Sequence, residues 1–370
     1  MRYLKKAIYF GSNILWNVLF RLFPLQEAKV LFLSDVREEL SGNLAYVAKA
    51  LPDEYKQVYS FKADRRQRRS FREYLALCFH LATARVIFLD DFSDATAFLN
   101  LRRRQQLVQL WHGSGAYKKF AYARGGENGD LKRIHPGYKR YSLAITSSRH
   151  ICKDYANAFR LPLAKVAATG IPRTDLFFDE KQCNALRETF YATYPALRTK
   201  KIVLFAPTYR GDKVEEADYD CSKLDLHALC QMLGEEYVFL IKWHPAFWQN
   251  VSSGRKEGFD LAGLEGFAYD VSAEREVNDL LLVADVLVTD YSSVIFDYAL
   301  LHRPIVYFAY DLDVYADGRG LFYPFKDYQY GPVAQNTYQL AQSILAGDLC
   351  EAARERFTEY FISEIGRAHV

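Results

Sequence analysis

Two Trp-His pairs are the first residues in this sequence that suggest chemistry. One ends the apolar run QLVQLWHG at residues 106–113, and the other ends VFLIKWHP at residues 238–245. Histidine titrates near neutral pH, so His112 or His244 could take a proton from a hydroxyl or donate a hydrogen bond to a phosphate. Either one could equally be a structural hydrogen-bonding residue at the end of a strand. The matched pair favours a functional role for both.

A second motif, DVLVTDYSSVIFDYALL at residues 285–301, could bind phosphate. Its strand-like run ends at Thr289 and Asp290, and Ser292 and Ser293 then stand where a helix is expected to begin. The free amides and the dipole of a helix N-terminus attract phosphate. The alternative is that Ser292 only caps the helix. We expect phosphate binding, because ligands of open α/β sheets lie at the carboxyl ends of strands.

The loop after the first Trp-His pair could meet a second substrate. Gly113 and Gly115 would let the backbone approach a ligand, and Lys118 and Lys119 could meet an anionic acceptor. Short glycine patterns also occur in ordinary turns, and exposed lysines usually face solvent. We place Gly113 and Lys118 on the acceptor side.

Two more segments carry candidate phosphate contacts. Arg173, in ATGIPRTDLFF at residues 168–178, could bind a phosphate in a bidentate manner or could pair with Asp175. Thr208 and Arg210 follow a strand-like run and could also contact phosphate.

These residues need a scaffold of alternating strands and helices. In the first half, apolar runs predict strands at 29–35, 85–90, 107–111 and 143–146, with helices at 41–51, 70–83 and 148–160. After Ala196 the pattern restarts, with strands at 202–207, 237–243, 285–290 and 304–310 and helices at 222–233, 276–284, 292–302 and 337–346. Continuous apolar strands between helices are typical of parallel sheets covered on both faces. The sequence therefore predicts an α/β fold with two doubly wound, Rossmann-type domains whose strand ends face a cleft.

The expected domain limits follow from this pattern. We expect an amphipathic segment at 1–24, an N-terminal acceptor domain at 25–185 and a C-terminal donor domain at 186–363. The last seven residues, EIGRAHV at 364–370, match the translation of a common sequencing adapter and are expected to be non-native.

Composition excludes several classes of protein. The 48 basic and 45 acidic residues leave a net charge of +3, which does not suggest a nucleic-acid-binding protein. The six cysteines show neither CxxC nor zinc-site spacing, so we expect reduced thiols. The DLD at 311–313 is too short a match to a metal-binding DxD, so we predict no metal and no cofactor. No apolar stretch reaches the ~18 residues of a transmembrane helix.

Six segments together resemble the CDP-glycerol glycerophosphotransferase family of teichoic acid synthesis. In order, they are QLWHGSGAYKKF, ITSS, ATGIPRTDLFF, VLFAPTYR, IKWHP and VTDYSSVIFDYALLHRPIVYFAYDLDVY. The resemblance implies a GT-B-like fold and transfer of glycerol phosphate from CDP-glycerol to a hydroxyl, with release of CMP. It implies that His112 is the base and that His244 contacts the donor phosphates. The family's other phosphate-region positions correspond to Arg173, Thr208, Ser292 and Ser293.

The resemblance leaves alternatives open. The family often has WHGTPLK where this chain has WHGSGAYK, which leaves the identity of the acceptor open; a lipid-linked polymer is expected. The donor could be CDP-ribitol. A GT-B glycosyltransferase would instead use a nucleotide sugar and release a nucleoside diphosphate. A non-catalytic protein would only bind the polymer.

The N-terminal segment suits a membrane surface. Residues 2–23 combine an apolar set with Arg2, Lys5, Lys6 and Arg21, and an arginine cluster lies at 65–72. Such a helix lies in the plane of an anionic bilayer, so we expect peripheral attachment at the cytoplasmic face of the cell membrane. The alternative is a helix packed on the domain. Polar residues within the apolar region argue against a cleaved signal peptide.

Overall fold

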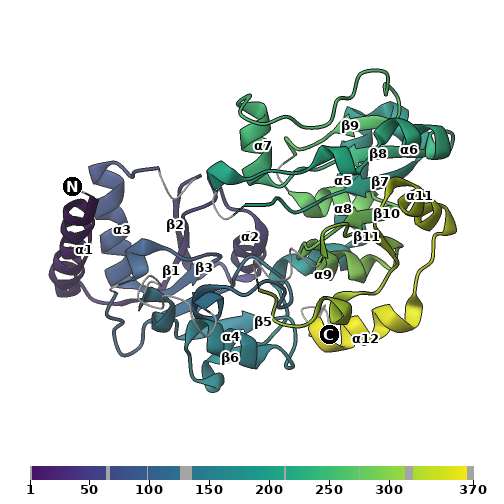
Figure 1. The fold of residues 1–370 in the computed structure, drawn as a ribbon. Coiled ribbons are helices and arrows are strands. Elements are labelled where there is room, and N and C mark those ends of the chain that lie inside the picture. Colours follow the sequence, from purple (N-terminus) through teal and green to yellow (C-terminus); the bar gives the residue numbers. More distant parts are fainter. Residues whose placement is uncertain are drawn as a thin grey trace. The chain divides into compact units, whose positions relative to one another are not determined.

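The chain forms two compact units, each built on one parallel sheet (Figure 1). The computed structural model describes residues 2–63, 67–97, 99–125, 136–211, 214–274, 276–312 and 320–364. One unit comprises residues 1–175 and 361–370, and the other comprises residues 176–360. Each described sheet has six strands, all paired in parallel with helices between them. The predicted fold class, with two doubly wound halves, is confirmed.

The first sheet has the strand order β2-β1-β3-β4-β5-β6. Its strands are β1 (Gln26–Ser34), β2 (Lys56–Phe61), β3 (Ala84–Leu89), β4 (Gln106–Gln109), β5 (Leu143–Thr146) and β6 (Val166–Ala168). The helices of this unit are α1 (Arg2–Leu19), α2 (Gly42–Ala50), α3 (Phe71–Thr83) and α4 (Cys152–Phe159). α3 begins where predicted, because Ser70 and Glu73 form a reciprocal capping box.

The second sheet has the order β12-β11-β10-β7-β8-β9. Its strands are β7 (Lys201–Phe205), β8 (Tyr237–Ile241), β9 (Ala268–Asp270), β10 (Val286–Thr289), β11 (Ile305–Phe308) and β12 (Val333–Ala334). The α-helices described after α4 are α5 (Glu180–Thr193), α6 (Leu226–Leu233), α7 (Pro245–Ser252), α8 (Val277–Val283), α9 (Val294–Tyr298), α11 (Thr337–Ala346) and α12 (Glu351–Phe361). β8 and β10 are buried along their whole length, as expected for strands covered on both faces.

The structure differs from the sequence-based expectation in several details. The helix expected at 292–302 is α-helical only over Val294–Tyr298 and continues as a 3₁₀ turn, Ala299–Leu301. The first unit ends at Asp175 rather than at 185, because α5 belongs to the second unit, where Arg187 Nε donates to Leu282 O at 3.2 Å.

The chain returns to the first unit at Phe361. Ser147 Oγ donates to Phe361 O at 2.6 Å, and Glu364 N donates to Ser147 O at 2.9 Å. Glu364 is the first residue of the suspected non-native tail, and residues 365–370 lie outside the described part. The origin of the tail stays a prediction.

Candidate active site

The candidate residues lie at the carboxyl ends of strands near the switch point of each sheet. In the first sheet the chain order reverses between β1 and β3, and in the second it reverses between β7 and β10. Ligands of open α/β sheets bind at such points, because loops from neighbouring strands diverge there. The two sites are described separately.

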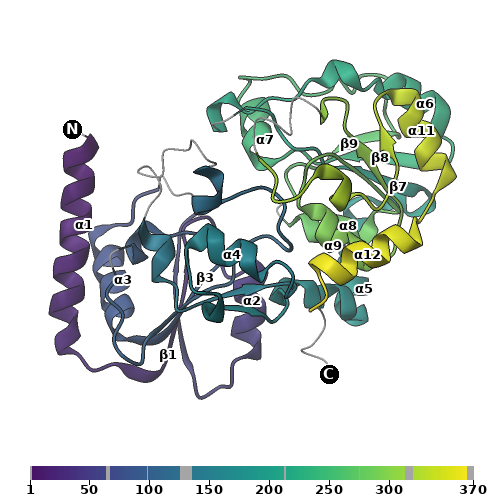
Figure 2. The same ribbon diagram turned by 60° about the horizontal axis from the view of Figure 1, so that its bottom comes forward.

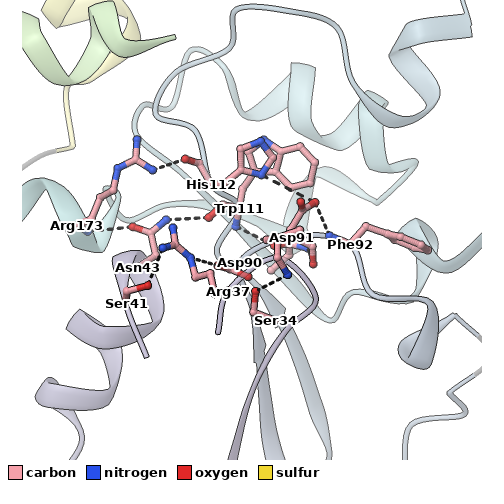
Figure 3. Close-up of polar contacts among 12 residues, drawn as sticks. Ser34, Arg37, Ser41, Asn43, Asp90, Asp91, Phe92, Trp111, His112 and Arg173 are labelled. Carbon is pink, nitrogen blue, oxygen red and sulfur yellow. Dashed lines mark hydrogen bonds and ion pairs between the residues drawn. The ribbon is translucent and has the colours of Figure 1, made fainter. Parts of the chain in front are cut away.

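His112 follows β4 and extends toward solvent. Its side chain is 51% exposed, whereas that of the preceding Trp111 is buried. His112 Nδ1 lies 3.9 Å from Oδ1 of Asp91, which follows β3 (Figure 3). A carboxylate beside Nδ1 favours the tautomer with its proton there, and this leaves Nε2 as the proton acceptor. The geometry fits a general base.

Arg173 contacts the same loop. Its guanidinium donates to His112 O, and its backbone N donates to Asn43 Oδ1 at 3.0 Å (Figure 3). Asn43 Nδ2 donates in turn to Trp111 O at 2.8 Å. The structure therefore brings Arg173 and His112 together, although the predicted phosphate contact of Arg173 stays a prediction.

A buried ion pair supports this edge of the sheet. Arg37 Nε lies 2.5 Å from Asp90 Oδ2, and Arg37 Nη1 donates to Ser41 Oγ at 2.8 Å (Figure 3). Burial raises the pKa of Asp90, and the charge of Arg37 opposes that rise. The pair ties the end of β3 to the segment before α2.

The loop after His112 is bound to its own unit. Gly113 follows directly, and Gly115 adopts a positive φ of 68°. Tyr155 Oη donates to Gly115 O at 2.8 Å, and Gly115 N donates to Ser147 Oγ at 3.0 Å. Lys118 is half-buried in the same loop. The acceptor roles of Gly113 and Lys118 stay predictions.

In the second unit, Thr208 and Asp290 are in direct contact. Thr208 N donates to Asp290 Oδ1 at 2.7 Å, which joins the ends of β7 and β10. Arg210 lies 2.9 Å from Asp290 Oδ2 and binds both oxygens of Asp311, at 2.6 and 2.9 Å. Burial would lower the pKa of Arg210, but the two carboxylates outweigh that effect and raise it. The guanidinium of Arg210 is thus paired with protein carboxylates in this structure.

His244 caps α7 with its ring. Its Nδ1 accepts a hydrogen bond from Ala246 N at 3.1 Å, and its ring centroid lies 4.7 Å from that of Tyr209. An Nδ1 that accepts requires the tautomer with the proton on Nε2. Exposed His244 therefore presents an N–H donor, whereas His112 presents an acceptor. With these tautomers, the two imidazoles differ in which nitrogen can accept a proton.

The two serines differ in what they do for α9. Ser292 Oγ accepts from Val294 N at 3.4 Å, which is a weak cap. Ser293 occupies the N-cap position with an exposed side chain that makes no capping hydrogen bond. Capping therefore does not account for Ser293, and phosphate binding by either serine stays a prediction.

Among the described residues, no group of three or more His, Cys, Asp or Glu side chains could hold a metal ion. Of the DLD segment, Asp311 pairs with Arg210, and Asp313 lies outside the described part. All six cysteines are free thiols.

Sequence reasoning missed four residues of these sites. They are Asn43, Asp91, Asp311 in its role as partner of Arg210, and Gln109, whose Nε2 donates to Asp91 O at 3.2 Å. Asp91 had a signal, because it directly follows the predicted strand at 85–90 and forms an aspartate pair with Asp90. Asn43 and Gln109 had none, since a polar residue in a first helical turn or at a strand end is common.

The chain is similar to known proteins over nearly its whole length. The family model for CDP-Glycerol:Poly(glycerophosphate) glycerophosphotransferase matches residues 15–364. The teichoic acid poly(ribitol-phosphate) polymerase of Bacillus spizizenii is 39% identical over 349 residues, which cover 94% of this chain and 55% of the polymerase. The teichoic acid ribitol-phosphate primase of the same species is 31% identical over 94% of this chain and 90% of the primase. The chain spans 55–65% of the length of the ribitol-phosphate polymerases that it matches.

Two further findings bear on donor and fold. Relatives named for ribitol phosphate match 90–94% of this chain, and those named for glycerol phosphate match 64–76%. The solved structure of the wall teichoic acid polymerase TagF superposes with a TM-score of 0.75 at 23% identity, covering 98% of this chain and 94% of that one, which shows a shared fold. With the family model matched over nearly its whole length, this chain belongs to the CDP-glycerol:poly(glycerophosphate) glycerophosphotransferase family.

Proposed function

We propose that this protein transfers a polyol phosphate from a CDP-alcohol to a hydroxyl of a lipid-linked teichoic acid or related polymer, and releases CMP. The observation that carries the proposal is His112, an exposed imidazole with Asp91 beside Nδ1 in a chain of this family. The acceptor oxygen attacks the polyol-bearing phosphorus, and the bond from that phosphorus to the bridging oxygen breaks. His112 takes the acceptor proton, and the electron pair leaves with CMP.

The second unit supplies the donor contacts in this proposal. His244 donates a hydrogen bond from Nε2 to a donor phosphate, and the hydroxyls of Thr208, Ser292 and Ser293 add further ones. Phosphoryl transfer depends on positioning and on charge stabilisation rather than on covalent catalysis. Uncharged hydrogen-bond donors that the fold already holds in place can stabilise the charge of the transition state, because they need not reorient during the reaction.

CDP-ribitol is the donor that we propose, with CDP-glycerol as the alternative. The sequence motifs alone favoured glycerol. Relatives named for ribitol phosphate match more of this chain than those named for glycerol phosphate, and this supports ribitol.

The test is CMP release by purified protein with each CDP-alcohol and a lipid-linked polymer acceptor. His112→Ala should lower the rate by about 10²–10⁴-fold, the share of general base catalysis. His227→Ala is the matched control, because His227 is an exposed histidine on α6. Near-wild-type release by folded His112→Ala would reject the base. Absence of release with both donors would reject the function.

We also propose peripheral attachment at the cytoplasmic face of the cell membrane, through α1. One face of α1 packs on α3, where Tyr74 Oη donates to Asn13 Oδ1 at 2.6 Å (Figure 2). The opposite face and the following turn are apolar and 41–86% exposed, and comprise Ile14, Leu15, Val18, Leu19, Leu22 and Phe23. Among the described residues, no helix combines the length and apolarity needed to cross a membrane.

The structure describes three of the five arginines in the predicted cluster, and one of them is paired with an aspartate. Arg69 lies 2.9 Å from Asp35 with a side chain that is 9% exposed, so it is not available to a membrane. Arg68 and Arg72 are exposed, and Arg65 and Arg66 lie outside the described residues. The apolar face of α1 is therefore the main candidate.

Sedimentation with anionic vesicles tests this attachment. Leu15→Glu with Val18→Glu should weaken binding at least about tenfold, because full burial of one such side chain contributes about 1.5–3 kcal/mol. Tyr338→Glu, which puts a charge at another exposed apolar residue, should bind like the wild type. Equal binding by all three proteins would exclude α1 as the anchor.

A further inference from the structure

Trp111 adopts a backbone conformation that tryptophan seldom takes. Its φ is +58°, in the left-handed region where Cβ crowds the following carbonyl. Such a conformation persists only where the surroundings determine it, and it often occurs at functional sites. Since Trp111 directly precedes His112, the contacts that fix the backbone of Trp111 also fix the position of the His112 backbone.

Two buried amide side chains hold Trp111 from opposite sides. Gln109 Oε1 accepts from Trp111 N at 2.8 Å, and Asn43 Nδ2 donates to Trp111 O at 2.8 Å. Gln109 is 0% exposed and Asn43 is 2% exposed. The indole packs against Phe120 and Phe159, with ring centroids 4.7 and 5.3 Å away. Both hydrogen-bonding groups of the Trp111 backbone are therefore paired with protein.

Each amide also binds a second residue that contacts His112. Gln109 Nε2 donates to Asp91 O at 3.2 Å, and Asp91 lies beside His112 Nδ1. Asn43 Oδ1 accepts from Arg173 N at 3.0 Å, and Arg173 donates to His112 O. Each amide uses its donor and its acceptor at once, which neither a carboxylate nor an apolar side chain can do.

We propose that Asn43 and Gln109 are positioning residues that set the place of His112 through the left-handed backbone of Trp111. This inference rests on the proposed role of His112 as the base. A reacting group displaced by about 1 Å can lose about 100-fold in rate. The two amides are expected to act on turnover, because their hydrogen bonds go to Trp111 and to residues that contact His112 in the first unit, whereas the proposed donor contacts belong to the second unit.

The kinetic test compares two buried glutamines at opposite ends of β4. Gln105 is 3% exposed, and its Nε2 donates to Leu81 O at 2.7 Å and to Ala84 O at 2.8 Å. Gln109→Leu should lower kcat for CMP release about 10–100-fold with unchanged donor KM. Gln105→Leu should lose similar stability yet keep its kcat. Equal kcat losses in the two variants would overturn the proposal.

A double-mutant comparison and a crystal structure complete the test. Asn43→Ala should lower kcat in the wild-type background and cause no further loss when combined with His112→Ala. In the crystal, Asn43→Ala should show Trp111 with negative φ and a displaced His112, and an unchanged loop would overturn the proposal. Asn43→Asp serves if alanine prevents folding, because it keeps the volume and the acceptor for Arg173 N but loses the donor. If the wild type releases no CMP, the proposed function fails, and the crystal structure still decides the inference.

Discussion

Arg210 joins three segments of the second unit, so its replacement by methionine should destabilise that unit. Its guanidinium contacts Asp290 at 2.9 Å and both oxygens of Asp311. The side chain of Asp290 is 1% exposed, so methionine would leave a buried charge whose remaining partners include the amides of Thr208 and Tyr291. Removing one partner of a buried ion pair costs about 3–5 kcal/mol. The retained amide bonds place the expected loss at about 3 kcal/mol.

Urea denaturation measures this loss, and hydrogen exchange of the Thr208 and Tyr291 amides locates it. Arg210→Lys keeps the charge but loses the planar fork, so it should cost about 1–2 kcal/mol. An Arg210→Met protein within about 1 kcal/mol of the wild type would refute the reasoning. Unchanged stability with lost affinity for the CDP-alcohol would instead make Arg210 a phosphate-binding residue.

Three other perturbations have defined outcomes. Burial and, to a smaller extent, the charge of Lys56 lower the pKa of Lys29 from 10.5 to about 8. Between these values the unfolded chain holds the Lys29 proton and the folded chain does not, so the unfavourable contribution of Lys29 to stability should shrink from pH 8 to 10.5. Lys29→Met should therefore raise the free energy of unfolding, measured in urea, by about 1–3 kcal/mol at pH 7 and by less at pH 10. An equal gain at the two pH values would contradict this prediction. Ser293→Ala should weaken CDP-alcohol binding by about 1–3 kcal/mol in calorimetry without lowering Tm, since its hydroxyl makes no capping bond, and unchanged affinity would remove it from the donor site. Gly331→Ala places Cβ 2.2 Å from Ile305 O and should cost about 3 kcal/mol, whereas Gly258→Ala meets atoms no closer than 3.5 Å and should melt like the wild type.

The central strands could be predicted from the sequence, but the edge strands could not. β2 and β6 end the first sheet, and β9 and β12 end the second. These are the four strands that the apolar runs did not reveal. An edge strand has a neighbour on one side and is partly exposed, so it needs no continuous apolar run. β2 has no buried residue, and β12 has two residues in all. Such a segment becomes a strand only because it pairs with a neighbouring strand that has already formed.

The sequence by itself determined which candidate residues stand at the carboxyl ends of strands. A histidine, a serine pair and an arginine stand after apolar runs, and the carboxyl ends of parallel strands gather such residues at one edge of each sheet. Chain order and apolar pattern are enough for that inference.

Only the tertiary structure decided what each of these side chains binds. Arg210 contacts aspartates after β10 and β11, and Asn43 reaches Trp111 from another strand–helix unit. The tautomers of the two histidines depend likewise on single neighbours, Asp91 for His112 and the amide of Ala246 for His244. Hydrogen bonds depend on ångström distances and on direction. A pattern of residue types specifies which strands align. The hydrogen-bond partner of each polar atom is fixed only in the tertiary structure, because the packing of the surrounding side chains restricts the position of that atom.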